Sequence, residues 1–88
     1  MEQAKVYFTK EITPDGLEKV YRALGAQLKG KVAVKISTGE PGGHNFLSPA
    51  LIQRLVGKLE GTIVECNTAY EGRRNTSAAH WQTFEEHG

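Results

Sequence analysis

Two polar segments contain most of the side chains that could bind a ligand or take part in a reaction. The first loop, residues 37–45 (STGEPGGHN), places a carboxylate, an imidazole and an amide among three glycines, namely Glu40, His44 and Asn45. Gly42 and Gly43 can bring backbone N–H groups close to an anion, because glycine adopts positive φ without strain. The alternative is a plain glycine-rich connection between a strand and a helix. The spacing matches neither G-x-G-x-x-G nor a Walker sequence, so nucleotide binding is not indicated.

The second loop, residues 67–75 (NTAYEGRRN), contributes amide, phenol and guanidinium groups through Asn67, Tyr70, Arg73 and Arg74. The two arginines come just before a helix start that Asn75 or Thr76 is expected to cap. Guanidinium donors beside a helix N-terminus favour a carboxylate or a phosphate. The alternative is a pair of solvated surface arginines.

The candidate catalytic residues are His44, Glu40 and Cys66. A nucleophilic Cys66 needs a nearby base, and His44 is the one that the sequence offers; the alternative is a buried cysteine that acts as a small hydrophobe. A metal would require convergence of Glu40, His44, Glu65, Cys66 and His80. No pair among these has the local spacing typical of zinc ligands, so no metal site is predicted, and His80 is expected to be a surface or helix-packing residue.

The elements that position these loops follow from hydrophobic patterning. Lys5–Thr9, Lys31–Ser37 and Thr62–Cys66 are rich in β-branched or aromatic residues and read as strands. Thr13-Pro14 and Ser48-Pro49 indicate helix starts, and a third helix is expected to carry Trp81 and Phe84 inward. The order β-α-β-α-β-α predicts one α/β domain over residues 1–88. It would be a small three-stranded parallel sheet with three helices, a Rossmann-like or flavodoxin-like half.

In open parallel sheets, ligands bind outside the carboxyl ends of the strands, where both loops would lie. A three-stranded sheet leaves two edges unpaired, and such edges pair readily with other chains. The sequence therefore predicts either a homo-oligomer or a missing domain that pairs the sheet edge.

The composition of the chain argues against nucleic acids and membranes as partners. The chain has 11 basic and 10 acidic residues among 88, so it lacks the basic excess of nucleic-acid-binding proteins. No apolar run reaches the length of a signal-peptide core or of a membrane span, so no membrane partner is expected. The single cysteine suits a reducing compartment, and a cytoplasmic protein is predicted.

Two stretches carry a resemblance to a known family. Residues 31–49 (KVAVKISTGEPGGHNFLSP) and residues 61–74 (GTIVECNTAYEGRR) resemble the amino-terminal part of the DUF362 family of uncharacterised proteins. The resemblance implies longer relatives, many of them iron–sulfur proteins in which a 4Fe-4S cluster is possible further along the chain. One cysteine cannot supply four cluster ligands, so no cofactor is expected in this chain, which would be a truncated or naturally short form. The matched loop positions are Glu40, Gly42, Gly43, His44, Asn45, Glu65, Asn67, Tyr70, Arg73 and Arg74.

The leading hypothesis is a module that binds a small anionic molecule between the two loops. The glycine N–H groups and the arginines would hold the anion, and His44 with Glu40 would supply acid–base or hydrogen-bonding groups. Two alternatives stay open: a part of an iron–sulfur redox protein that lacks its cluster domain, and a structural or assembly module without a ligand of its own. The sequence assigns no reaction.

Overall fold

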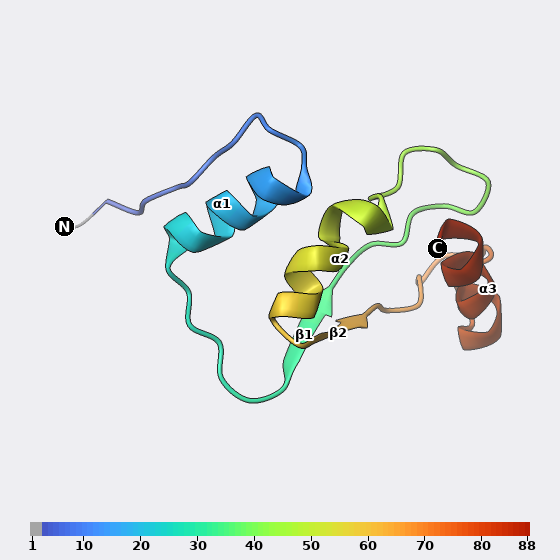
Figure 1. Cartoon of the computed structure of the whole chain (residues 1–88). Coiled ribbons are helices and arrows are strands. Elements are labelled where there is room, and N and C mark those ends of the chain that lie inside the picture. Colours follow the sequence, from blue (N-terminus) through green and yellow to red (C-terminus); the bar gives the residue numbers. More distant parts are fainter. Residues whose placement is uncertain (1–2) are drawn as a thin grey trace.

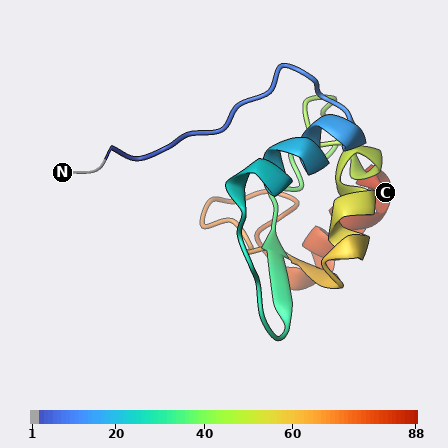
Figure 2. The same ribbon diagram turned by 60° about the vertical axis from the view of Figure 1, so that its left-hand side comes forward.

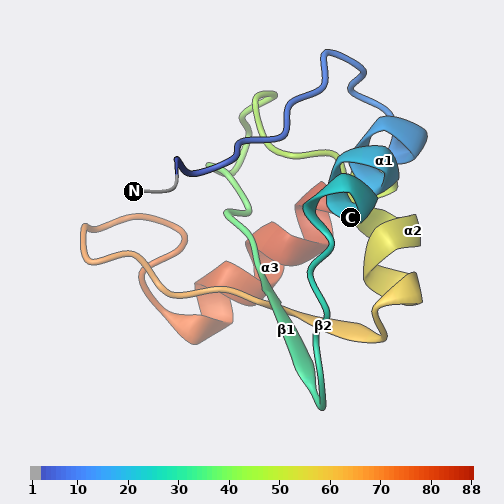
Figure 3. The ribbon, with the colours of Figure 1, turned by 90° about the vertical axis from the view of Figure 1, so that its left-hand side faces the viewer.

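The computed structural model describes residues 3–88, which form two strands and three helices (Figure 1). The elements are α1 (Pro14–Leu24), β1 (Val32–Lys35), α2 (Pro49–Lys58), β2 (Gly61–Val64) and α3 (Ser77–His87). The two strands pair in parallel, with Val34 opposite Ile63. Their carboxyl ends point toward α3, while α1 packs on α2 (Figure 3).

The expected helix starts are confirmed, and each has a hydroxyl cap, a proline at the first position, or both. α1 begins after Thr13, whose Oγ1 accepts a hydrogen bond of 3.0 Å from the N–H of Gly16. α3 begins after Thr76, whose Oγ1 accepts from the N–H of Ala79 at 3.2 Å. α2 begins at its proline after Ser48, which makes no side-chain capping bond. No helix within residues 3–88 is long and apolar enough to cross a bilayer.

The predicted three-stranded sheet is wrong. The sheet has two strands within the described residues, and Lys5–Thr9 forms no strand there. Figure 1 and Figure 2 show this segment running away from the sheet and the helices. β-Branched and aromatic residues favour an extended backbone, but a strand also needs a neighbour that supplies its hydrogen bonds. Without that neighbour, the Rossmann-like or flavodoxin-like half is not completed.

Ion pairs contribute to the position of α1 on α2. Glu18 of α1, whose side chain is 8 % exposed, lies 2.8 Å from Lys58 Nζ and 3.2 Å from Arg54 Nη2. Asp15 also pairs with Arg54. The pKa of Glu18 is lowered, first by the hydrogen bond from Lys58, against the opposing effect of burial, and further by Arg54. These ion pairs therefore help to hold α1 against α2.

The described residues contain no fully buried hydrophobic side chain. The buried side chains are polar or charged: Glu18, Thr38, His80 and Thr83. Trp81 is 66 % exposed, so its predicted inward position is wrong. The accessible surface is 7084 Å², whereas a folded monomer of 9.7 kDa exposes about 5100 Å². The radius of gyration is 15.3 Å, compared with about 12 Å for a compact chain of this length.

Replacement of the Glu18 carboxylate tests the importance of the ion pairs between α1 and α2. In Glu18→Gln, two cations lose their shared nearly buried partner, so we expect a lower thermal unfolding midpoint and weaker protection of α1 amides from hydrogen exchange. The matched control is Lys19→Gln, because Lys19 forms only an exposed pair with Glu11, at 3.6 Å. Equal stability of the two variants would contradict a structural role for Glu18.

Candidate functional site

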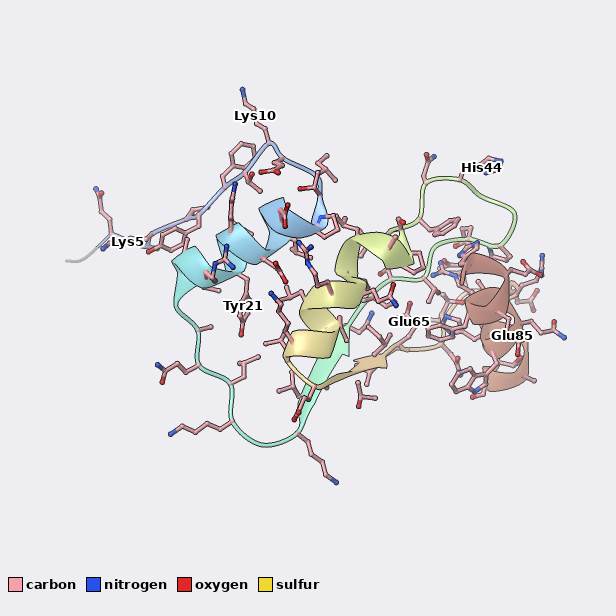
Figure 4. All side chains as sticks on the ribbon, viewed as in Figure 1. Lys5, Lys10, Tyr21, His44, Glu65 and Glu85 are labelled. Carbon is pink, nitrogen blue, oxygen red and sulfur yellow. The ribbon has the colours of Figure 1, made fainter. Side chains whose placement is uncertain are left out.

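A carboxylate at the end of β2 joins both strands. The Glu65 side chain is 6 % exposed and lies between the sheet and α3 (Figure 4). Its Oε1 accepts hydrogen bonds from Lys35 Nζ at 2.7 Å and from the Cys66 N–H at 2.9 Å. Its Oε2 accepts from the Thr38 N–H at 2.8 Å. One side chain therefore binds the chain segments that leave both strands.

These donors determine the ionisation of Glu65. Burial of the carboxyl by itself would raise its pKa. Hydrogen bonds from Lys35, and from the N–H groups of Cys66 and Thr38, outweigh burial and hold the pKa at about 2 rather than 4.5. Glu65 is consequently a carboxylate at neutral pH, and its oxygens are occupied as acceptors, which suits a structural group better than a proton-transfer group.

His80, in the first turn of α3, extends this network. Its side chain is 5 % exposed, and both ring nitrogens have partners. Nδ1 lies 3.1 Å from Asn67 Oδ1, and Nε2 lies 2.9 Å from Thr38 Oγ1. An amide oxygen can only accept, so Nδ1 is assigned the proton, and Nε2 faces the Thr38 hydroxyl, which also lies 3.3 Å from Glu65 Oε2. His80 is thus a helix-packing residue with a polar function, and not a surface residue.

A second histidine of α3 contacts the same threonine. His87 Nδ1 lies 2.6 Å from the carbonyl oxygen of Thr38, to which it donates. The His87 ring stacks on Phe46, with ring centroids 3.8 Å apart and an interplanar angle of 3°. Thr38 therefore uses its N–H, its hydroxyl and its carbonyl to connect β2 and α3 with the base of the first loop.

An open cleft lies beside this network, between α2, the strand ends and α3. A cavity of about 160 Å³ adjoins Glu65 and Asn67, and a second of about 260 Å³ reaches Phe46 and His87. The two cavities share Ile63, Trp81 and Phe84, so the cleft is largely apolar, with a carboxylate at one end.

The two predicted loops are joined by Glu40, Tyr70 and Arg74. The Tyr70 hydroxyl donates to Glu40 Oε1 at 2.6 Å, and Arg74 Nη2 donates to Tyr70 Oη at 2.7 Å. Arg74 also pairs directly with Glu40. The Arg74 side chain is 11 % exposed, whereas that of Glu40 is 58 % exposed. The hydrogen bond from Tyr70, and then that from Arg74, lowers the pKa of Glu40.

The glycines of the first loop form a turn. The Gly43 N–H donates to the Glu40 carbonyl at 3.1 Å, and Gly42 has a φ of 77°. Proline at the second position and positive φ at the third are typical of a type II turn. The Gly43 N–H is therefore engaged within the loop and does not point freely at a ligand.

The remaining predicted residues do not converge with this cluster. His44 and Asn45 are exposed, and the His44 ring stands out from the tip of the first loop (Figure 4). Cys66 is exposed rather than buried. No hydrogen bond within residues 3–88 joins His44 to Cys66, so a thiol–imidazole pair is not assembled. Arg73 pairs with Glu86 on α3, away from Arg74.

The groups weighed as metal ligands are dispersed. Glu65 and His80 lie 3.9 Å apart, Glu40 pairs with Arg74, and His44 is exposed. No group of three potential ligand side chains forms within the part of the chain that the structure describes.

The sequence interpretation missed Thr38, the pairing of Lys35 with Glu65, and the contacts of both α3 histidines. One signal was present: Lys35 ends β1 and Glu65 directly follows β2, so both lie at the carboxyl end of the sheet, where consecutive parallel strands bring such residues close together. The contacts of Thr38 had no sequence signal, because they depend on the position of α3.

Comparisons with models of known protein families, with curated proteins and with solved structures give no match. The resemblance to the DUF362 family therefore stays a prediction, and the chemistry of the site has to be argued from its geometry.

The low pKa of Glu65 predicts an acid-sensitive fold. A carboxylate whose folded pKa lies below its unfolded value stabilises the fold above about pH 4.5, and this contribution is lost as pH falls toward 2. The difference corresponds to about 3 kcal/mol at neutral pH. We expect Glu65→Gln to lose a comparable part of the free energy of unfolding at pH 7 in urea titrations.

The gap between wild type and Glu65→Gln should narrow at pH 3. Glu85→Gln is the matched control, because Glu85 is an exposed carboxylate on α3 (Figure 4). A gap of constant size from pH 7 to pH 2.5 would show that the Glu65 charge has no stabilising role.

Proposed function

We propose that this chain is a ligand-binding module that holds a small carboxylate or phosphate at Arg74 and Tyr70, between the first and second loops. The observation that carries the proposal is the nearly buried Arg74 guanidinium, which faces an exposed carboxylate on the opposite loop. A buried cation needs an anionic partner, and here that partner is the easily displaced Glu40. In this proposal the chain is the amino-terminal part of a DUF362-like protein.

Glu40 occupies the position that the anionic group of a ligand would take. Its carboxylate receives donors from both Tyr70 and Arg74, which is the donor set that a ligand carboxylate or a phosphate prefers. More than half of the Glu40 side chain is exposed, so it can turn into water when a ligand enters. The resident carboxylate competes with the ligand, and affinity is therefore lower than it would be for an empty site.

The cleft beside α3 is less suited to an anion. Glu65 is a carboxylate at neutral pH and lies at the polar end of this cleft, where it would repel a second negative charge. The electrostatics thus favour the Arg74 side of the molecule. Arg73 contributes less, because Glu86 already neutralises it.

Anion titrations of four proteins test the proposal. Inorganic phosphate, sulfate and succinate are titrated at constant ionic strength, and binding is followed by thermal unfolding and by amide chemical shifts of the two loops. We expect binding in wild type, binding that is about tenfold tighter in Glu40→Gln because the competitor is gone, and loss of binding in Arg74→Gln. Arg73→Gln, the matched control, should bind like wild type.

Circular dichroism identifies variants that do not fold, and Arg74→Lys serves where Arg74→Gln is unfolded. Arg74→Lys keeps the charge but loses the planar donor pair, so it should bind more weakly than wild type. Unchanged affinity in Glu40→Gln, or equal losses in the Arg73 and Arg74 variants, contradicts a site at Arg74.

A further inference from the structure

The amino-terminal segment before α1 exposes apolar side chains in an extended backbone. Val6 is 88 % exposed and Phe8 is 79 % exposed, and they alternate with Tyr7. In an extended segment, residues two apart lie on the same side, so Val6 and Phe8 form one apolar edge. Within residues 3–88, no strand pairs with this segment. Its backbone hydrogen-bonding groups and its apolar edge are therefore both available to a partner.

The sheet offers a complementary surface. Since β1 pairs with only one side of β2, the outer edge of β2 has no neighbouring strand among the described residues. On the side of β2 that faces the helices, Ile63 lines both cavities of the cleft and also a third, of about 420 Å³, against α2. A strand added beside β2 would place alternate side chains over this apolar cleft.

The side-chain pattern selects one register. If the segment runs parallel to β2 with Phe8 beside Ile63, then Val6 lies beside Gly61, and both apolar side chains face the cleft. Tyr7 then lies beside Thr62 on the opposite, exposed side. Val6 then lies beside Gly61, over which the side chains of Val34 and Val56 already pack, so Val6 adds to an apolar group.

Charge supports the same register and the same edge. In it, Lys5 lies beside Glu60, so a basic residue meets an acidic one at the start of the strand pair. The edge of β1 is instead preceded by Lys31, which would repel Lys5 of the segment.

The size of the exposed surface fits a partner that is a second copy of the chain. The chain exposes about 2000 Å² more than a compact monomer of its mass, and an interface of standard size buries about 800 Å² on each partner. If two copies related by a twofold axis exchange their segments, each β2 edge is paired and the assembly closes as a dimer. We propose that residues 5–9 of one copy add as a third, parallel strand to β2 of a second copy, with Phe8 over the cleft at Ile63.

Directed disulfide formation tests the partner, the edge and the register together. In a Cys66→Ser background, the Tyr7→Cys chain is mixed with the Thr62→Cys chain and oxidised gently. The proposed pairing places these positions opposite each other on the exposed side of the added strand, so a disulfide-linked heterodimer is expected. Tyr7→Cys mixed with Ala33→Cys, which lies on the same side but on β1, is the matched control and should give little product.

Sedimentation velocity provides an independent measurement on the natural sequence. Wild type should shift from monomer to dimer with rising concentration, and Phe8→Ser should weaken the dimer about tenfold or more. Leu28→Ser, which removes another exposed apolar side chain (54 % exposed), should leave the dimer unchanged. Circular dichroism confirms that each variant retains its helices.

Three results would overturn the proposal: a wild-type monomer at all concentrations, cross-linking to β1 in preference to β2, or a disulfide within one chain when Tyr7→Cys and Thr62→Cys are combined. The last would mean that the segment folds back onto its own sheet. None of these results bears on the anion site, because Arg74 and Tyr70 lie outside the proposed interface.

Discussion

The rest of the structure depends on one nearly buried carboxylate, Glu65, which accepts hydrogen bonds from several parts of the chain. Glu65 binds Lys35 from the neighbouring strand and Thr38 from the base of the first loop. Thr38 then contacts both histidines of α3. Two four-residue strands supply few backbone hydrogen bonds of their own, so these side-chain contacts hold together the carboxyl end of the sheet, the first loop and the last helix.

Polar contacts hold the helices and loops together here, a role that apolar packing has in larger domains. α1 is linked to α2 through Glu18, and the two loops are linked through Glu40 and Arg74. Each depends on ionised groups, so the arrangement responds to pH and, at its exposed pairs, to salt. Apolar side chains are half-buried or exposed instead, which accounts for the open cleft and for the amino-terminal segment that lies outside the sheet.

Local features were predictable from the sequence because they depend on near neighbours. A threonine cap or a proline indicated each helix start, and the predicted strands at 31–37 and 62–66 overlap the observed strands at 32–35 and 61–64. The error over Lys5–Thr9 arose because strand propensity carries no information about a partner. The site residues were hard to predict for the same reason. The contact between Glu40 and Arg74 depends on how the two loops fold, and the sequence does not show that Arg74, rather than Arg73, makes it.

The contacts of Thr38 also limit which residues can replace it and its neighbour Gly39. Its hydroxyl has two polar neighbours, so serine could reproduce these contacts, whereas valine would have the right shape without the hydrogen bonds. At the next position, Gly39 has a φ of 80°, and a Cβ there would lie 2.5 Å from the Cβ of Phe46. Two consecutive residues at the base of the first loop therefore have little freedom to vary: a hydroxyl is needed at the first and glycine at the second.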